Sequence, residues 1–272
     1  MDHIFTLEHI FPLSSFLLYI QFIFFIILIM KKVFYILVGL GFIGCAGHYD
    51  WVDDFEYKPI TTQQKQIATW QKITSIKSPI HIYIEGDGHA YFANGAPTPN
   101  PTPHDSFMRD LAMRDDAENV VYVARPCQFI MDEKCDFHDW TDARFSEQNV
   151  DSVANATRKI ANGRHVILIG YSGGAMMTGL VIKNNPDIKV KKWITIAGVL
   201  NHHDWTTYFN DAHLDKSLDL DALPNVPQIH YVGAHDSVVP ITLSQQWISA
   251  DKIQVLDNAS HSKFPDLKLD FD

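Results

Sequence analysis

Residues 165–177 read HVILIGYSGGAMM. The first six, HVILIG, are nearly all apolar, which is typical of a strand buried on both faces of a parallel sheet. The run ends in GYSGG at 170–174, which fits the pattern G-x-S-x-G, and a helix-like segment follows. This context predicts a tight turn that lifts the hydroxyl of Ser172 above the sheet as a nucleophile, with glycines that let strand and helix approach closely. A glycine-rich turn in which Ser172 only caps the helix is the alternative.

Strand-like runs recur along the chain, with helix-like segments between them. They lie at 79–86, 119–124, 165–170, 191–198, 228–233 and 252–256, with less distinct ones at 55–60 and 67–73. This alternation predicts an α/β fold with a mostly parallel central sheet and helices on both faces. The segment 201–226, rich in His, Asp and Trp, is expected to form a small lid or insertion, and no second domain is expected.

A nucleophilic serine needs a histidine base and a carboxylate that orients the base. The sequence AHDSVVP, after the strand-like run at 228–233, offers Asp236, and DNASHSKF, after the last run, offers His261. Both fall at the carboxyl ends of strands, at the edge of the sheet where Ser172 is expected. Asp204 and Asp257 are rival acids, whereas His261 is the only histidine that follows the last strand-like run.

With this order of serine, acid and histidine, residues 79–265 resemble the α/β-hydrolase superfamily. The resemblance rests on GYSGG, on GAHDSVVP and on the histidine loop near the end of the chain. It implies that Ser172 attacks an acyl carbonyl, that His261 acts as general base and that Asp236 orients His261. The backbone N–H of Gly173, at the start of a helix, is expected to donate to the oxyanion.

The sequence EGDGHAY at 85–91 is the candidate source of a second oxyanion donor. A strand ends at Glu85, and the glycines that follow let backbone N–H groups turn toward the site. The loop resembles the H-G-G-G loops of esterases, with Glu85 in place of the leading histidine, which leaves the donor at either Asp87 or Gly88. A simple turn is the alternative. EGDGHAY together with RPCQF at 125–129 resembles a group of exported bacterial hydrolases in the superfamily.

Composition and the remaining motifs exclude several classes. The formal net charge of −10 argues against a nucleic-acid partner, because phosphate backbones repel an acidic surface. The chain has neither a dinucleotide-binding fingerprint nor a P-loop. NHHDW at 201–205 and CDFHDW at 135–140 lack the spacing of metal-ligand pairs. We therefore expect no cofactor, no metal and a small-molecule acyl substrate.

The N-terminal residues do not read as part of this fold. Residues 10–30 are almost all apolar and long enough to span a bilayer. After two lysines comes a second apolar run, 33–44, which has the length of a signal-peptide core and precedes Cys45. The ending FIGC resembles a bacterial lipobox, with Phe42 where leucine is usual, and this resemblance implies lipidation of Cys45.

The simplest interpretation starts translation at Met30. The segments are then an over-extended start (1–29), a lipoprotein-type signal peptide (30–44), a linker (45–54) and the hydrolase domain (55–272). A membrane helix at 10–30 that tethers the domain is the alternative. Both place the domain outside the cytoplasm and attached to a membrane, at the periplasmic or outer-membrane face for a bacterial lipoprotein.

The cysteine count agrees with export. Three cysteines are present, and if Cys45 carries lipid, Cys127 and Cys135 remain at the ends of the short stretch CQFIMDEKC. In an exported protein this pair predicts a disulfide, with two reduced, buried thiols as the alternative.

These observations together predict a membrane-anchored serine hydrolase that cleaves carboxylic esters. A peptidase with the same three residues is the near alternative, since the sequence does not reveal the substrate. A membrane-anchored lipoprotein that keeps the fold but only binds its ligand is the alternative from another class. A metal-dependent hydrolase is a further, weaker one.

Overall fold

The strand that carries the G-x-S-x-G pattern, β7 (Val166–Tyr171), lies inside an eight-stranded sheet. The structure is a computed structural model, and it describes residues 51, 54–265 and 267–272. All six residues of β7 are buried. The strand pairs in parallel with β5 (Ile80–Ile84) on one side and with β8 (Val190–Ile196) on the other. The predicted strand, buried on both faces, is confirmed.

The other strands extend the sheet on both sides of these three. They are β1 (Glu56–Tyr57), β4 (Thr69–Ile73), β6 (Asn119–Val123), β9 (Gln228–Gly233) and β10 (Ile253–Leu256), in the spatial order β1-β4-β6-β5-β7-β8-β9-β10. Strands β6, β5, β7, β8, β9 and β10 pair in parallel, whereas β4 and β1 run antiparallel at one edge. A separate pair joins β2 (Ile60–Thr61) to β3 (Gln66–Ile67). The mostly parallel sheet is as predicted.

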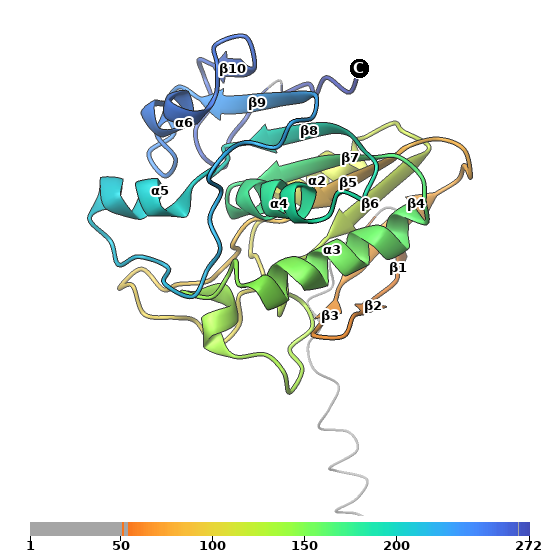
Figure 1. Cartoon of the computed structure of the whole chain (residues 1–272), viewed down its shortest axis with the longest axis horizontal. Helices are drawn as coiled ribbons and strands as arrows, with labels where there is room; N and C mark the ends of the chain where they lie inside the picture. The colour runs from red at the N-terminus through yellow and green to blue at the C-terminus, as the bar shows by residue number, and fades with distance from the viewer. Residues whose placement is uncertain (1–50, 52–53, 266) are drawn as a thin grey trace, which may run out of the picture. The chain divides into compact units, whose positions relative to one another are not determined.

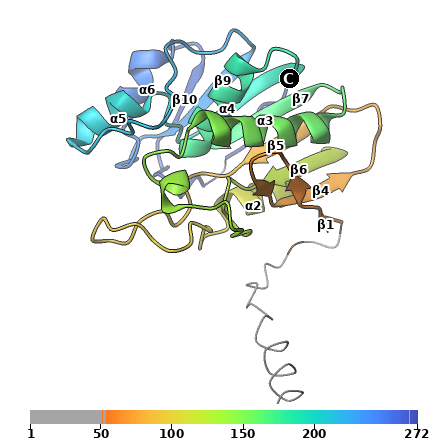
Figure 2. The same ribbon diagram turned by 60° about the horizontal axis from the view of Figure 1, so that its bottom comes forward.

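Helices cover both faces of the sheet, which confirms the predicted layers. Figure 1 shows α3 (Glu147–Ala161) and α4 (Gly173–Asn184) on one face and α2 (Phe107–Met113) behind the strands. Figure 2, turned about the horizontal axis, shows α3 and α4 lying side by side across that face. Each face has its own apolar cluster, one under α3 and α4 and the other under α2 and the C-terminal side chains of Phe264, Leu267, Leu269 and Phe271.

The segment 201–226 lies between β8 and β9, as expected. It begins with α5 (His202–Phe209) and continues as irregular chain, in which Leu214 and Leu220 are buried against the cluster under α3 and α4. After β9 comes α6 (Ile241–Trp247). The segment thus packs on the body of the fold and borders the site described below.

Cys127 and Cys135 form a disulfide, as predicted, with their Cα atoms 5.8 Å apart. The bond closes a loop between β6 and the short 3₁₀ helix η1 (Phe137–Trp140). Cys127 and Phe129 have φ values of 68° and 63°, so the chain turns sharply here.

The expectations for 1–29, for 30–44 and for Cys45 fall on residues outside the described ranges. Trp51, in the stretch predicted as a linker, stacks on Trp70 with ring centroids 4.9 Å apart. Among the residues that the structure describes, no helix combines the length and apolar character needed to cross a membrane.

Candidate active site

Ser172 occupies the sharp turn between β7 and α4. Its φ of 51° and ψ of −121° lie in a region that residues with a side chain rarely adopt. A Cβ atom on Gly170 would lie 2.4 Å from the carbonyl oxygen of Gly174, and one on Gly174 would lie 2.5 Å from that of Glu85. Both positions therefore need glycine, as the spacing of the motif predicts.

The structure brings Ser172, His261 and Asp236 together in one hydrogen-bonded row. Ser172 Oγ lies 3.0 Å from His261 Nε2, and His261 Nδ1 lies 3.0 Å from Asp236 Oδ2. The backbone N–H groups of Val238 and Val239 each donate to Asp236 Oδ1 at 2.8 Å. These bonds hold a fully buried carboxylate behind the histidine ring.

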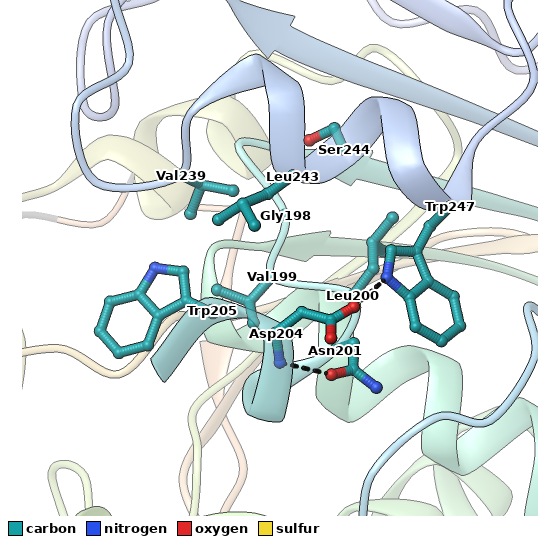
Figure 3. A pocket seen from close by; sticks show the side chains of 10 residues that line it. All are labelled: Gly198, Val199, Leu200, Asn201, Asp204, Trp205, Val239, Leu243, Ser244 and Trp247. Carbon is teal, nitrogen blue, oxygen red and sulfur yellow. Dashed lines mark hydrogen bonds between the residues drawn. The ribbon is translucent and has the colours of Figure 1, made fainter. Parts of the chain in front are cut away.

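The two rival acids lie elsewhere. Trp247 Nε1 donates to Asp204 Oδ2 at 2.8 Å, and the backbone N–H of Asp204 donates to Asn201 at the start of α5 (Figure 3). Asp204 therefore fixes α5 against α6. Asp257 is exposed after β10. Of the three carboxylates considered from the sequence, only Asp236 contacts His261 in the part of the chain that the structure describes.

The loop that follows β5 leaves the backbone N–H groups of Asp87 and Gly88 available to a ligand. The N–H of Gly86 donates to the Glu85 side chain at 2.8 Å, and the N–H of His89 donates to Pro101 O at 3.0 Å. Within the described residues, the N–H groups of Asp87 and Gly88 donate to no protein acceptor, and both residues border the cavity at Ser172. Both candidates from the sequence are thus N–H groups of this loop that the fold itself does not use.

Glu85 is a buried acid that borders the same cavity as Ser172. Its carboxylate accepts hydrogen bonds from Tyr122 Oη and from the N–H of Gly86, both at 2.8 Å. Burial raises the pKa of Glu85 to about 7, although both hydrogen bonds favour the ionised form. At neutral pH the carboxyl therefore exists in both protonation states.

Two arginines that the sequence analysis did not single out hold Asp87. Its carboxylate accepts from Arg125 Nη1 at 3.1 Å and from Arg144 Nη1 at 2.5 Å, and both arginines are buried. Burial alone raises the pKa of Asp87, but the two guanidiniums outweigh it and hold the pKa below its usual value. Arg125 belongs to the stretch RPCQF, which was noted only for a family resemblance. Nothing in the sequence DAR around Arg144 indicated a residue of the site.

A cavity of about 710 Å³ opens at Ser172 and His261. Its walls come from the loop after β5, from Arg144 and Phe145, and from α5 and the irregular chain after it. Apolar side chains line much of it: Ala90, Phe145, Val199, Trp205, Leu214 and Val238. Its size and mixed lining suit a small molecule with an apolar part.

The structure gives NHHDW no metal-binding arrangement. In the described ranges, no group of three or more His, Cys, Asp or Glu side chains is arranged to hold a metal ion. His202 is buried and its ring lies parallel to that of Phe145, with centroids 6.1 Å apart. His203 stacks on His213 instead.

Solved structures share this fold at low sequence identity. A serine hydrolase from Cycloclasticus zankles superposes with a TM-score of 0.50 and 10% identity, covering 76% of this chain and 91% of that one. An acylaminoacyl peptidase from Pyrococcus horikoshii superposes with a TM-score of 0.51 and 15% identity, covering 77% of this chain and 38% of that one. Identities this low establish the α/β-hydrolase fold alone.

Sequence comparison gives the family. No curated protein matches the chain significantly. The profile of a family described as "Serine hydrolase (FSH1)" matches residues 96–262, more than half of the chain, and this range includes Ser172, Asp236 and His261. The chain therefore belongs to the FSH1 serine hydrolase family, within the α/β-hydrolase superfamily.

Proposed function

We propose that this serine hydrolase cleaves carboxylic esters of small molecules through an acyl-enzyme on Ser172. The observation that carries the proposal is the row Ser172–His261–Asp236, with two hydrogen-bond distances of 3.0 Å, at one end of a partly apolar cavity. A nucleophile within hydrogen-bond reach of an oriented base is the arrangement that acyl transfer needs.

Acylation begins when Ser172 Oγ attacks the ester carbonyl carbon while His261 Nε2 takes the hydroxyl proton. The carbonyl π electrons move to oxygen, and the resulting oxyanion accepts from the N–H of Gly173 and from that of Asp87 or Gly88. Asp236 keeps the tautomer of His261 that has its proton on Nδ1, and it stabilises the imidazolium. When the tetrahedral intermediate collapses, the alkoxide leaves with the proton from His261.

Deacylation repeats these steps with water. His261 Nε2 takes a proton from a water molecule as the water oxygen attacks the acyl carbon. Collapse of the second tetrahedral intermediate breaks the bond to Ser172 Oγ, which recovers its proton from His261, and the carboxylic acid is released. Esters are the favoured substrates because an alkoxide leaves more readily than an amide nitrogen.

A matched set of variants tests this proposal on the full-length chain. Asp236→Asn should lower kcat for p-nitrophenyl esters by about 10⁴-fold and Ser172→Ala by more than that, the losses typical of such residues in serine hydrolases. Asp204→Asn is the control, because it makes the same change in an acid that contacts Trp247 and not His261. Its kcat should stay within about twofold of wild type.

The same assay separates the alternatives. An ester and an anilide with the same acyl group are compared, and we expect the ester to be cleaved much faster. Faster anilide cleavage would favour a peptidase. A folded wild-type protein that hydrolyses neither would contradict the proposal and favour a binding protein.

The proposed location is outside the cytoplasm, with a membrane anchor at Cys45. The Cys127–Cys135 disulfide supports an oxidising compartment. Mass spectrometry of the mature protein from cells tests the anchor. An N-terminal lipid-modified Cys45 is expected, and an unmodified chain that retains residues 30–44 would contradict it.

A further inference from the structure

The loop that carries the second oxyanion donor is held by a set of buried side chains outside the row of Ser172, His261 and Asp236. Gln128 Nε2 donates to the carbonyl oxygen of Gly86 at 2.9 Å, and Gln128 Oε1 accepts from the backbone N–H of Arg125, also at 2.9 Å. Gln128 therefore connects the turn after β6 to the loop after β5.

The Asp87 side chain is held from two directions at once. Arg125 reaches Asp87 Oδ1 and also donates to the carbonyl oxygen of Arg144 at 2.8 Å. Arg144 reaches Asp87 Oδ2 and donates to the carbonyl oxygen of Thr141 at 2.7 Å and to Tyr91 Oη at 3.0 Å. Each guanidinium thus bridges the carboxylate and the neighbouring backbone, so the carboxylate has little freedom to move.

The carboxylate held in this way lies against the other proposed oxyanion donor. A Cβ atom on Gly173 would be 2.1 Å from Asp87 Oδ1, so the carboxylate fills the space that a side chain at 173 would take. A Cβ atom on Gly88 would be 2.2 Å from the carbonyl oxygen of Pro101, which closes the other side of the loop. The position in which Asp87 is held therefore sets the distance between the N–H of Gly173 and the N–H groups of Asp87 and Gly88.

We infer that Arg125, Arg144 and Gln128 are positioning residues that lock Asp87 over Gly173 and so fix the geometry of the oxyanion hole. Their hydrogen bonds go to Asp87, Gly86, Tyr91 and neighbouring backbone, and within the described residues none goes to Ser172 or His261, so we assign their effect to the backbone N–H groups of the loop. The inference rests on the proposed function, since it assigns a role in the same reaction. It predicts losses in stabilisation of the transition state with little change in substrate binding.

The experiment compares full-length wild type with Arg144→Lys, Asp87→Asn and the double variant. Arg144→Lys keeps the positive charge but loses the planar fork, and Asp87→Asn keeps the shape but weakens both bridges. Arg158→Lys is the matched control, because Arg158 forms a similar two-bond bridge to Asp187 on the exposed surface away from the site. The measurements are kcat and KM for a p-nitrophenyl ester and thermal unfolding. The Ki of a trifluoromethyl ketone is measured too, since its adduct with Ser172 places an oxyanion in the hole.

We expect kcat to fall roughly 10- to 100-fold in both single variants, the scale of a displaced or lost oxyanion donor. KM should change less than about threefold and Ki should rise in parallel with the loss in kcat. The double variant should lose little more than either single one, because the side chains act as a unit. Arg158→Lys should match wild type.

Three results would overturn the inference. One is folded single variants with nearly wild-type kcat. Another is a loss of activity that a higher KM or a lower unfolding temperature explains completely, while the Ki of the trifluoromethyl ketone stays constant. The third is failure of both single variants to fold, which would give the bridges a role in fold stability. An inactive wild-type protein would instead contradict the proposed function, so the two failures are distinguishable.

Discussion

Ser172 lies within hydrogen-bond distance of His261 and has an unfavourable backbone conformation. A non-glycine residue in such a region costs of order 1–3 kcal/mol, and it persists only where the surroundings require it. Here the surroundings are Gly170 and Gly174, whose hydrogens face backbone atoms of α4 and β5. Because the turn is defined by residues within two positions of Ser172, its local sequence was enough to predict it.

The contacts that two arginines make with Asp87 could not be predicted from the sequence. Arg125 and Arg144 contact Asp87 from 38 and 57 residues away along the chain. No local pattern of charge or periodicity encodes such a contact, because it depends on which loops the folded sheet brings to the same edge. That Asp236 and His261 lie close to Ser172 could be predicted, because their positions after particular strands follow from the topology.

The buried carboxyl group of Glu85 should make the free energy of unfolding depend on pH. Its pKa in the folded protein is raised to about 7 from 4.5, so the ionised carboxylate destabilises the fold. The cost is absent below about pH 4.5, grows between pH 4.5 and 7 and levels off at about 3 kcal/mol above pH 7. Glu85→Gln, which can still accept from Gly86, should therefore be more stable than wild type at pH 8, and the difference should shrink toward pH 5.

Urea unfolding of both proteins at pH 5 and pH 8 measures this difference. Glu133→Gln removes the same charge from an exposed side chain and serves as the control. A difference between Glu85→Gln and wild type that is the same at both pH values would contradict the raised pKa.

At the scale of elements, the parallel strands were predicted and the antiparallel edge was not. Strands such as β5, β7 and β8 have apolar residues at nearly every position, a pattern that indicates burial on both faces. The runs at 55–60 and 67–73 were recognised, but their antiparallel pairing in β1 and β4 depends on the path of the chain between strands. The seven-residue helix α2 is too short for its periodicity to predict it.

The turn closed by the disulfide should contribute both to stability and to activity. Cys127 lies between Arg125 and Gln128, so the bond to Cys135 braces the turn from which both side chains reach the loop after β5. Opening the short loop by reduction should lower the free energy of unfolding by roughly 2–3 kcal/mol. It should also lower kcat, because the turn is then less constrained.

Urea unfolding and ester hydrolysis with and without reductant measure these effects. In the variant with both Cys127→Ser and Cys135→Ser, reductant should change neither quantity, which separates the disulfide from other effects of the reagent. An unchanged unfolding midpoint in reduced wild type would contradict the role given to the bond.

At the scale of the whole molecule, the sheet explains why residues far apart in sequence meet. Parallel strands bring their carboxyl ends to one edge, and Ser172, Asp236 and His261 each follow a different strand at that edge. The order of these residues along the chain was therefore informative. The packing of the C-terminal residues was not predicted: Phe271 stacks on His81 at 4.2 Å between centroids, and Asp270 contacts Lys192.

Labelling with a fluorophosphonate tests the central claim most directly, because this reagent reacts with a serine that a neighbouring base activates. The full-length protein is labelled, digested and mapped by mass spectrometry, next to Ser172→Ala and His261→Ala. The account predicts one labelled residue, Ser172, with no label in Ser172→Ala and much slower labelling in His261→Ala. A folded protein that takes up no label, or takes it up at another residue, would contradict the account.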